Sequence, residues 1–177
     1  PSGYATQVYD LTEYLNYGAE NLLTVRVDAS TEEGWYYEGA GIYRDVWLEK
    51  MSLVHVAPFG TFVTSHITDS YKAADVNIEV RLSNKGLEPA NCTVVNRVLD
   101  ATGREVVSTQ KSDITLAPKQ EEVKLLQSVK MNNIHLWNLE QPYLYTLYTD
   151  VYVGEKLVDT YSTNFGIRKI EFDPQKG

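Results

Sequence analysis

The sequence has few of the residues that metal, redox and nucleic-acid sites require. Only one of its 177 residues is cysteine and three are histidine, so no intrachain disulfide can form and close-set metal ligands are lacking. Acidic residues outnumber basic ones by 24 to 16, which gives a net charge of −8. That balance excludes the basic surface that nucleic acids and anionic membranes attract. No apolar run reaches the roughly 18 residues of a membrane-spanning helix. We therefore expect no metal, no cofactor, no nucleic-acid partner and no membrane partner.

Motifs for catalysis are also missing. There is no Gly-x-Ser-x-Gly elbow, and Gly39-Ala40-Gly41 is not followed by the helical pattern of a dinucleotide-binding loop. Cys92 lies inside an alternating strand pattern, which favours a buried, inert thiol. The adjacent pairs Glu32-Glu33 and Glu121-Glu122 point to opposite sides of an extended chain. Neither pair converges on a substrate, so we expect no catalytic residue in this chain.

What the sequence does contain is the pattern of an all-β protein. Hydrophobic residues make up 43% of the chain and tyrosine occurs 13 times, which suits strands packed around a core. In Asp75–Leu82 the even positions are apolar and the odd positions polar, so one face is buried. Similar runs, separated by turn residues, occur at 60–68, 91–99, 104–107, 121–129, 143–153, 156–163 and 165–172. About seven strands over roughly 110 residues predict an immunoglobulin-like β-sandwich.

The first third of the chain has a different character. Strands are predicted at 21–28 and 42–56, with a short helical turn at Asp10–Leu15 that Asp10 caps. So few strands make a poor independent sandwich. We place the boundary at Ala57–Gly60, because proline disfavours a central strand position. The predicted domains are residues 1–56 and 57–174, followed by a linker at 175–177.

The loop at 34–41 is the best candidate for binding. It holds Trp35, Tyr36, Tyr37 and Glu38 between glycines, and aromatic rings beside a carboxylate suit the apolar face and the hydroxyls of a sugar. Loops at the end of a rigid sandwich often carry function. The alternative is that these rings pack between two domains.

Several ordered motifs together carry a resemblance to one enzyme family. They are Ser2-Gly3-Tyr4, Tyr9–Leu15, Gly18–Val27, Gly39–Leu48, Leu136-Trp137-Asn138, Gln141–Leu147 and Phe165–Phe172. As a set they resemble glycoside hydrolase family 2, of the β-galactosidase type. The first four are similar to the C-terminal half of its sugar-binding, galactose-binding-like jelly roll, and the rest to the immunoglobulin-like domain that follows.

The resemblance implies a parent enzyme that hydrolyses β-glycosides with retention, while this chain serves as a scaffold. The family keeps its two catalytic glutamates on a barrel that should start near Asp173, so neither is carried over. Tyr36, Tyr37 and Glu38 match by position a loop that approaches the active site in some members, and we count Trp35 with them as a candidate for the substrate rim. Arg44, Asp45, Trp137 and Arg168 match positions for which we predict structural roles, Arg44 and Asp45 as an ion pair or part of a hydrogen-bond network.

Other functions remain open at this point. The chain could be a free-standing carbohydrate-binding or adhesion module, or its parent could be a β-glucuronidase or a β-mannosidase. An incomplete jelly roll leaves strand edges without partners, which invites packing onto the sandwich or pairing between copies. The sequence leaves the location of the parent open, with the periplasm or secretion slightly favoured.

Overall fold

The chain divides into two compact units, which are described separately. The computed structural model describes residues 5–28 and 41–175, and contacts group the chain into Pro1–Leu48 and Glu49–Gly177. The division falls before the boundary predicted at Ala57–Gly60, because residues 54–57 are already buried in the core of the second unit. No helix in the described part of the chain is long and apolar enough to cross a membrane.

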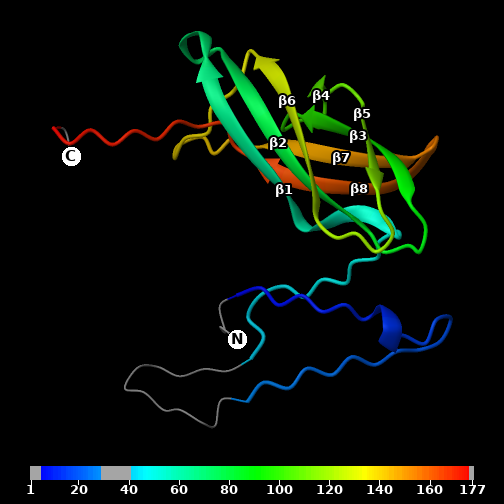
Figure 1. The fold of residues 1–177 in the computed structure, drawn as a ribbon. Helices are drawn as coiled ribbons and strands as arrows, with labels where there is room; N and C mark the ends of the chain where they lie inside the picture. The colour runs from blue at the N-terminus through cyan, green and yellow to red at the C-terminus, as the bar shows by residue number, and fades with distance from the viewer. Residues whose placement is uncertain (1–4, 29–40, 176–177) are drawn as a thin grey trace. The chain divides into compact units, whose positions relative to one another are not determined.

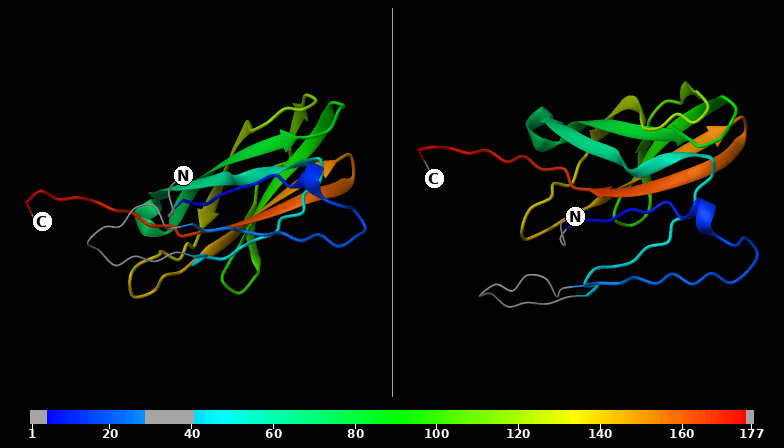
Figure 2. Two further views of the ribbon diagram at one scale, coloured as in Figure 1. Left: turned by 90° about the horizontal axis from the view of Figure 1, so that it is seen from below. Right: turned by 60° about the horizontal axis from the view of Figure 1, so that its bottom comes forward.

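The second unit is a sandwich of two antiparallel sheets (Figures 1 and 2). The three-stranded sheet has the order β1-β2-β6, with β1 at Val54–Thr68, β2 at Ala73–Asn84 and β6 at Val123–Asn132. The five-stranded sheet has the order β4-β3-β7-β8, with β5 also paired to β3. Its strands are β3 at Ala90–Leu99, β4 at Glu105–Ser108, β5 at Ser112–Leu116, β7 at Tyr145–Val153 and β8 at Lys156–Phe165. The predicted all-β class is confirmed.

The apolar positions of the alternating sequence pattern form the core between the two sheets. In β2 the side chains of Val76, Ile78, Val80 and Leu82 are buried, while the residues between them are exposed or half-buried. This is the face predicted from the alternation at 75–82. The buried side chains of β3, β7 and β8 join them in one cluster, since side chains on the inner faces of two stacked sheets interdigitate.

A bulge in β1 lets this strand contact both sheets. The pairing of β1 with β2 shifts register between Val56 and Thr61, around the proline that sequence analysis took for a boundary. Beside it, the Val56 N–H donates to Asp159 Oδ2 at 2.8 Å, and Thr61 Oγ1 lies 2.5 Å from Thr163 Oγ1. Asp159 and Thr163 both belong to β8. Proline is tolerated here because a bulge interrupts the ladder.

Two strand predictions in the sandwich need correction. A last strand was predicted at 165–172, but β8 ends at Phe165 and no ladder follows in the described chain. The carbonyl of Ile167 instead accepts the Trp137 N–H at 2.9 Å. Strand β5 was missed, because five residues give too short an alternation to stand out from a loop.

The first unit contains the predicted helical turn but not the predicted strands. Residues Thr12–Tyr14 form a 3₁₀ turn, and Asp10 Oδ1 accepts the Thr12 N–H at 3.0 Å. The Asn21 side chain closes the next turn by accepting the Asn16 N–H at 2.7 Å. Neither 21–28 nor 42–53 is in a strand. Alternation reports only which side chains prefer burial, whereas a strand also needs a hydrogen-bonded neighbour, and none is present in the described residues.

Candidate functional site

The residues predicted to bind a sugar cannot be placed. Trp35, Tyr36, Tyr37 and Glu38 lie outside the described residues. Arg44 and Asp45, nearby in the sequence, are both exposed, and the Arg44 guanidinium carbon lies 5.2 Å from the centre of the Tyr43 ring. The predicted roles of these six residues therefore remain predictions.

The structure brings two predicted structural residues, Trp137 and Arg168, together at the end of β8. The Arg168 guanidinium carbon lies 5.2 Å from the Trp137 ring centre, within the range of a cation–π contact. Gly166 lies under the same ring: a Cβ at position 166 would be 2.9 Å from Trp137 Cβ and 3.1 Å from Cγ. Together with the Trp137–Ile167 hydrogen bond, these contacts fix the course of the chain as it leaves β8.

An aromatic row continues from this end of the sandwich into the core. The rings of His135 and Tyr143 stack at 4.8 Å, Tyr143 meets Tyr145 edge-on at 5.0 Å, and Tyr145 lies against Phe165 at 5.7 Å. Burial raises the pKa of the Tyr145 phenol, although the His135 N–H that it accepts at 2.8 Å opposes the rise. Tyr145 therefore stays protonated near neutral pH and acts as a packed structural group.

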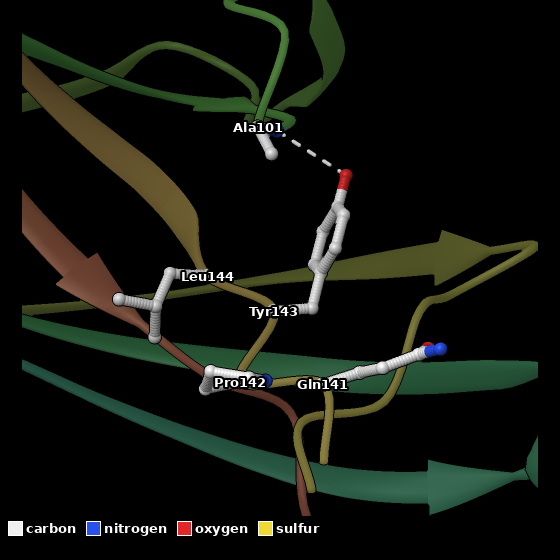
Figure 3. Close-up of a pocket in the computed structure, with 5 residues that line it drawn as sticks. All are labelled: Ala101, Gln141, Pro142, Tyr143 and Leu144. Atoms are coloured by element: carbon white, nitrogen blue, oxygen red, sulfur yellow. Dashed lines mark hydrogen bonds between the residues drawn. The ribbon is translucent and has the colours of Figure 1, made fainter.

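The hollow beside this row is lined by apolar side chains, an amide and a phenol. It measures about 520 Å³ and is lined by Ala101, Gln141, Pro142, Tyr143 and Leu144 (Figure 3). The Tyr143 hydroxyl already accepts the Ala101 N–H at 3.2 Å. The lining supplies neither a carboxylate nor an imidazole, which are the usual acid–base groups of enzymes. This hollow can receive an apolar group but offers no chemistry.

A second hollow, of about 330 Å³, contains carboxylates. It is lined by Glu49, Lys50, Met51, Val56 and Asp159–Ser162. The Asp159 carboxylate accepts a hydrogen bond from the Val56 N–H, and this contact holds β1 against β8. Across the described residues, no three His, Cys, Asp or Glu side chains gather closely enough to hold a metal ion.

The buried carboxylate of Asp150 also has a structural partner. It is 2% exposed, and it accepts Arg97 Nε at 2.6 Å and Thr160 Oγ1 at 2.9 Å. The hydrogen bond to Asp150 raises the pKa of the Arg97 guanidinium, which also lies 5.6 Å from the Tyr148 ring centre. An ion pair in this geometry fixes β3 beside β7 and leaves no carboxylate oxygen for a substrate.

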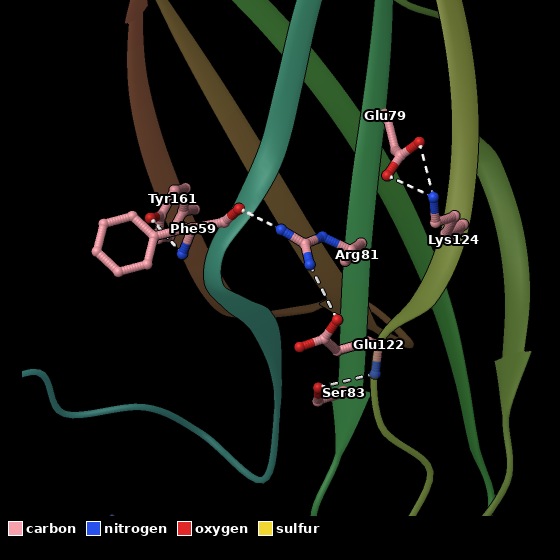
Figure 4. A network of polar contacts seen from close by, with 7 residues as sticks. All are labelled: Phe59, Glu79, Arg81, Ser83, Glu122, Lys124 and Tyr161. Carbon is pink, nitrogen blue, oxygen red and sulfur yellow. Dashed lines mark hydrogen bonds and ion pairs between the residues drawn. The ribbon is translucent and has the colours of Figure 1, made fainter. Parts of the chain in front are cut away.

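Sequence analysis missed the β1 bulge, which presents an aromatic ring to solvent. Phe59 has a φ of 54° and is 61% exposed; a positive φ is a genuine outlier for so bulky a residue. Its N–H donates to Tyr161 Oη at 3.1 Å, and its carbonyl accepts Arg81 Nη2 at 2.7 Å (Figure 4). One partner comes from each sheet, so both backbone groups of Phe59 are fixed.

The neighbouring glycine explains why the bulge has this shape. A Cβ at Gly60 would lie 2.4 Å from the Ala57 carbonyl oxygen and 2.9 Å from that of Arg81. The signal in the sequence was a Pro-Phe-Gly triplet inside an alternating run, since glycine within a strand pattern marks a bulge.

Comparison with known proteins shows what the chain is similar to. The model of the family described as glycosyl hydrolases family 2 matches residues 54–168. The β-galactosidase BoGH2A of Bacteroides ovatus is 42% identical over 178 residues, covering all of this chain and 21% of that protein. A β-glucuronidase of Formosa agariphila is 27% identical, over 99% of this chain and 20% of its own length.

Solved structures agree with these sequence matches. A glycosyl hydrolase family 2 member from Bacteroides cellulosilyticus superposes with a TM-score of 0.85 at 28% identity, over 95% of this chain and 23% of that one. The chain thus spans about a fifth of the length of the relatives it matches.

Proposed function

Because the chain belongs to glycosyl hydrolase family 2, we propose that it is a non-catalytic scaffold region of a longer retaining β-galactosidase. The observation that carries the proposal is the 42% identity to a β-galactosidase along the whole chain, which covers only 21% of that enzyme. Four fifths of such an enzyme lies elsewhere, which leaves ample room for the catalytic residues.

The contacts of the carboxylates support a scaffold role. Asp159 and Asp150 are tied to a backbone N–H and to an arginine, respectively. A carboxylate used in this way stabilises strand pairing and is not available as a nucleophile or as a general acid. The hollow lined by Ala101 and Gln141–Leu144 has no carboxyl group in its lining, so it lacks the pair of carboxyl groups, about 5–5.5 Å apart, on which retaining glycosidases depend.

The substrate is tested on the longer protein that contains this chain. We expect 4-nitrophenyl β-galactoside to be hydrolysed at least about tenfold faster than the β-glucuronide, a preference worth about 1.4 kcal/mol in the transition state. The opposite preference would reassign the parent to the β-glucuronidases, whose sequences also match this chain.

The scaffold role is tested by two substitutions in the same longer protein. Asp159→Asn and Asp150→Asn should lower thermal stability but leave kcat within about threefold of the wild type, because a general acid or base contributes about 10²–10⁴-fold. A loss of kcat of that size with the melting temperature unchanged would show that one of these residues is catalytic.

A further inference from the structure

We draw no further inference here: the strongest candidate, the apolar hollow at the end of the sandwich lined by Ala101 and Gln141–Leu144, carries nothing because no contact in the described part of the chain shows what covers it.

Discussion

A polar network inside the sandwich gives the sharpest test of how the two sheets are held together. Asn96 of β3 is completely buried. Its side chain donates to Gln127 Oε1 of β6 at 2.5 Å and accepts Thr149 Oγ1 of β7 at 2.5 Å. Gln127 belongs to the three-stranded sheet and the other two residues to the five-stranded sheet, so the network joins the sheets across the core.

Replacing Asn96 with alanine should cost about 2–4 kcal/mol of unfolding free energy. The buried Thr149 hydroxyl would lose its acceptor, which costs about 1–3 kcal/mol, and the hydrogen bond to Gln127, worth about 1 kcal/mol, would also disappear. Gln127 should contribute less to the loss, because it is half-buried and also donates to Ser112 at 2.8 Å.

A double-mutant cycle separates the network from the cavity left by the substitution. Thr149→Val alone leaves the Asn96 oxygen unpaired, but in the Asn96→Ala background it removes an orphaned hydroxyl. The two substitutions should therefore be less costly together than the sum of the singles, by about 1–2 kcal/mol. Urea unfolding followed by far-ultraviolet circular dichroism measures each value. The control is Asn91→Ala on the exposed side of β3, for which we expect a change below about 0.5 kcal/mol. Strict additivity, or a cost for Asn96→Ala no larger than the control, would refute the reasoning.

Three further predictions concern a glycine, a carboxylate and the thiol. Gly60→Ala should destabilise the protein by more than about 2 kcal/mol, because two backbone carbonyl oxygens lie 2.4 and 2.9 Å from the new Cβ. Gly154→Ala meets open space and should cost only the strain of its positive φ, about 1 kcal/mol. Denaturant titration of both variants tests this ranking. The hydroxyl hydrogen bond from Thr102 lowers the pKa of Asp100, so Asp100→Asn should melt below the wild type at pH 7. That difference should shrink below pH about 3.9 and vanish below the folded-state pKa; a difference that grows on acidification would contradict the sign. Burial raises the pKa of the Cys92 thiol, so an aromatic disulfide reagent should label it only as fast as the sandwich unfolds, and rapid labelling of the native chain would be inconsistent with its position.

The alternation in the sequence predicts the middle of the sandwich well because burial there follows strand periodicity directly. Strand β2 has its four apolar even positions in the core. The same rule misses Asn96, since a polar residue at an inward position breaks the alternation and gives no sign that two other strands supply its partners. Its neighbours Val94 and Val98 identify the inward face, but only the three-dimensional pairing shows that Asn96 is satisfied there.

Long-range partners explain the other differences. Pro58 is a plausible domain boundary from local conformational rules, yet it lies in a strand because Tyr161 and Arg81, distant in the sequence, stabilise the bulge next to it. Residues 166–172 have the composition of a strand, but the contact of Trp137 with Gly166 directs the chain away from the ladder. Local propensity cannot anticipate contacts of this kind.

The measurement that tests the central claim most directly is hydrolysis of 4-nitrophenyl β-galactoside by the isolated 177-residue chain, at high protein concentration and beside the longer protein. A scaffold region of a family 2 glycosidase predicts turnover by the longer protein and none by the chain above the rate without protein. Turnover that rises in proportion to the concentration of the isolated chain, and that Asp159→Asn or Asp150→Asn abolishes, would contradict the account and place catalytic residues within the chain itself.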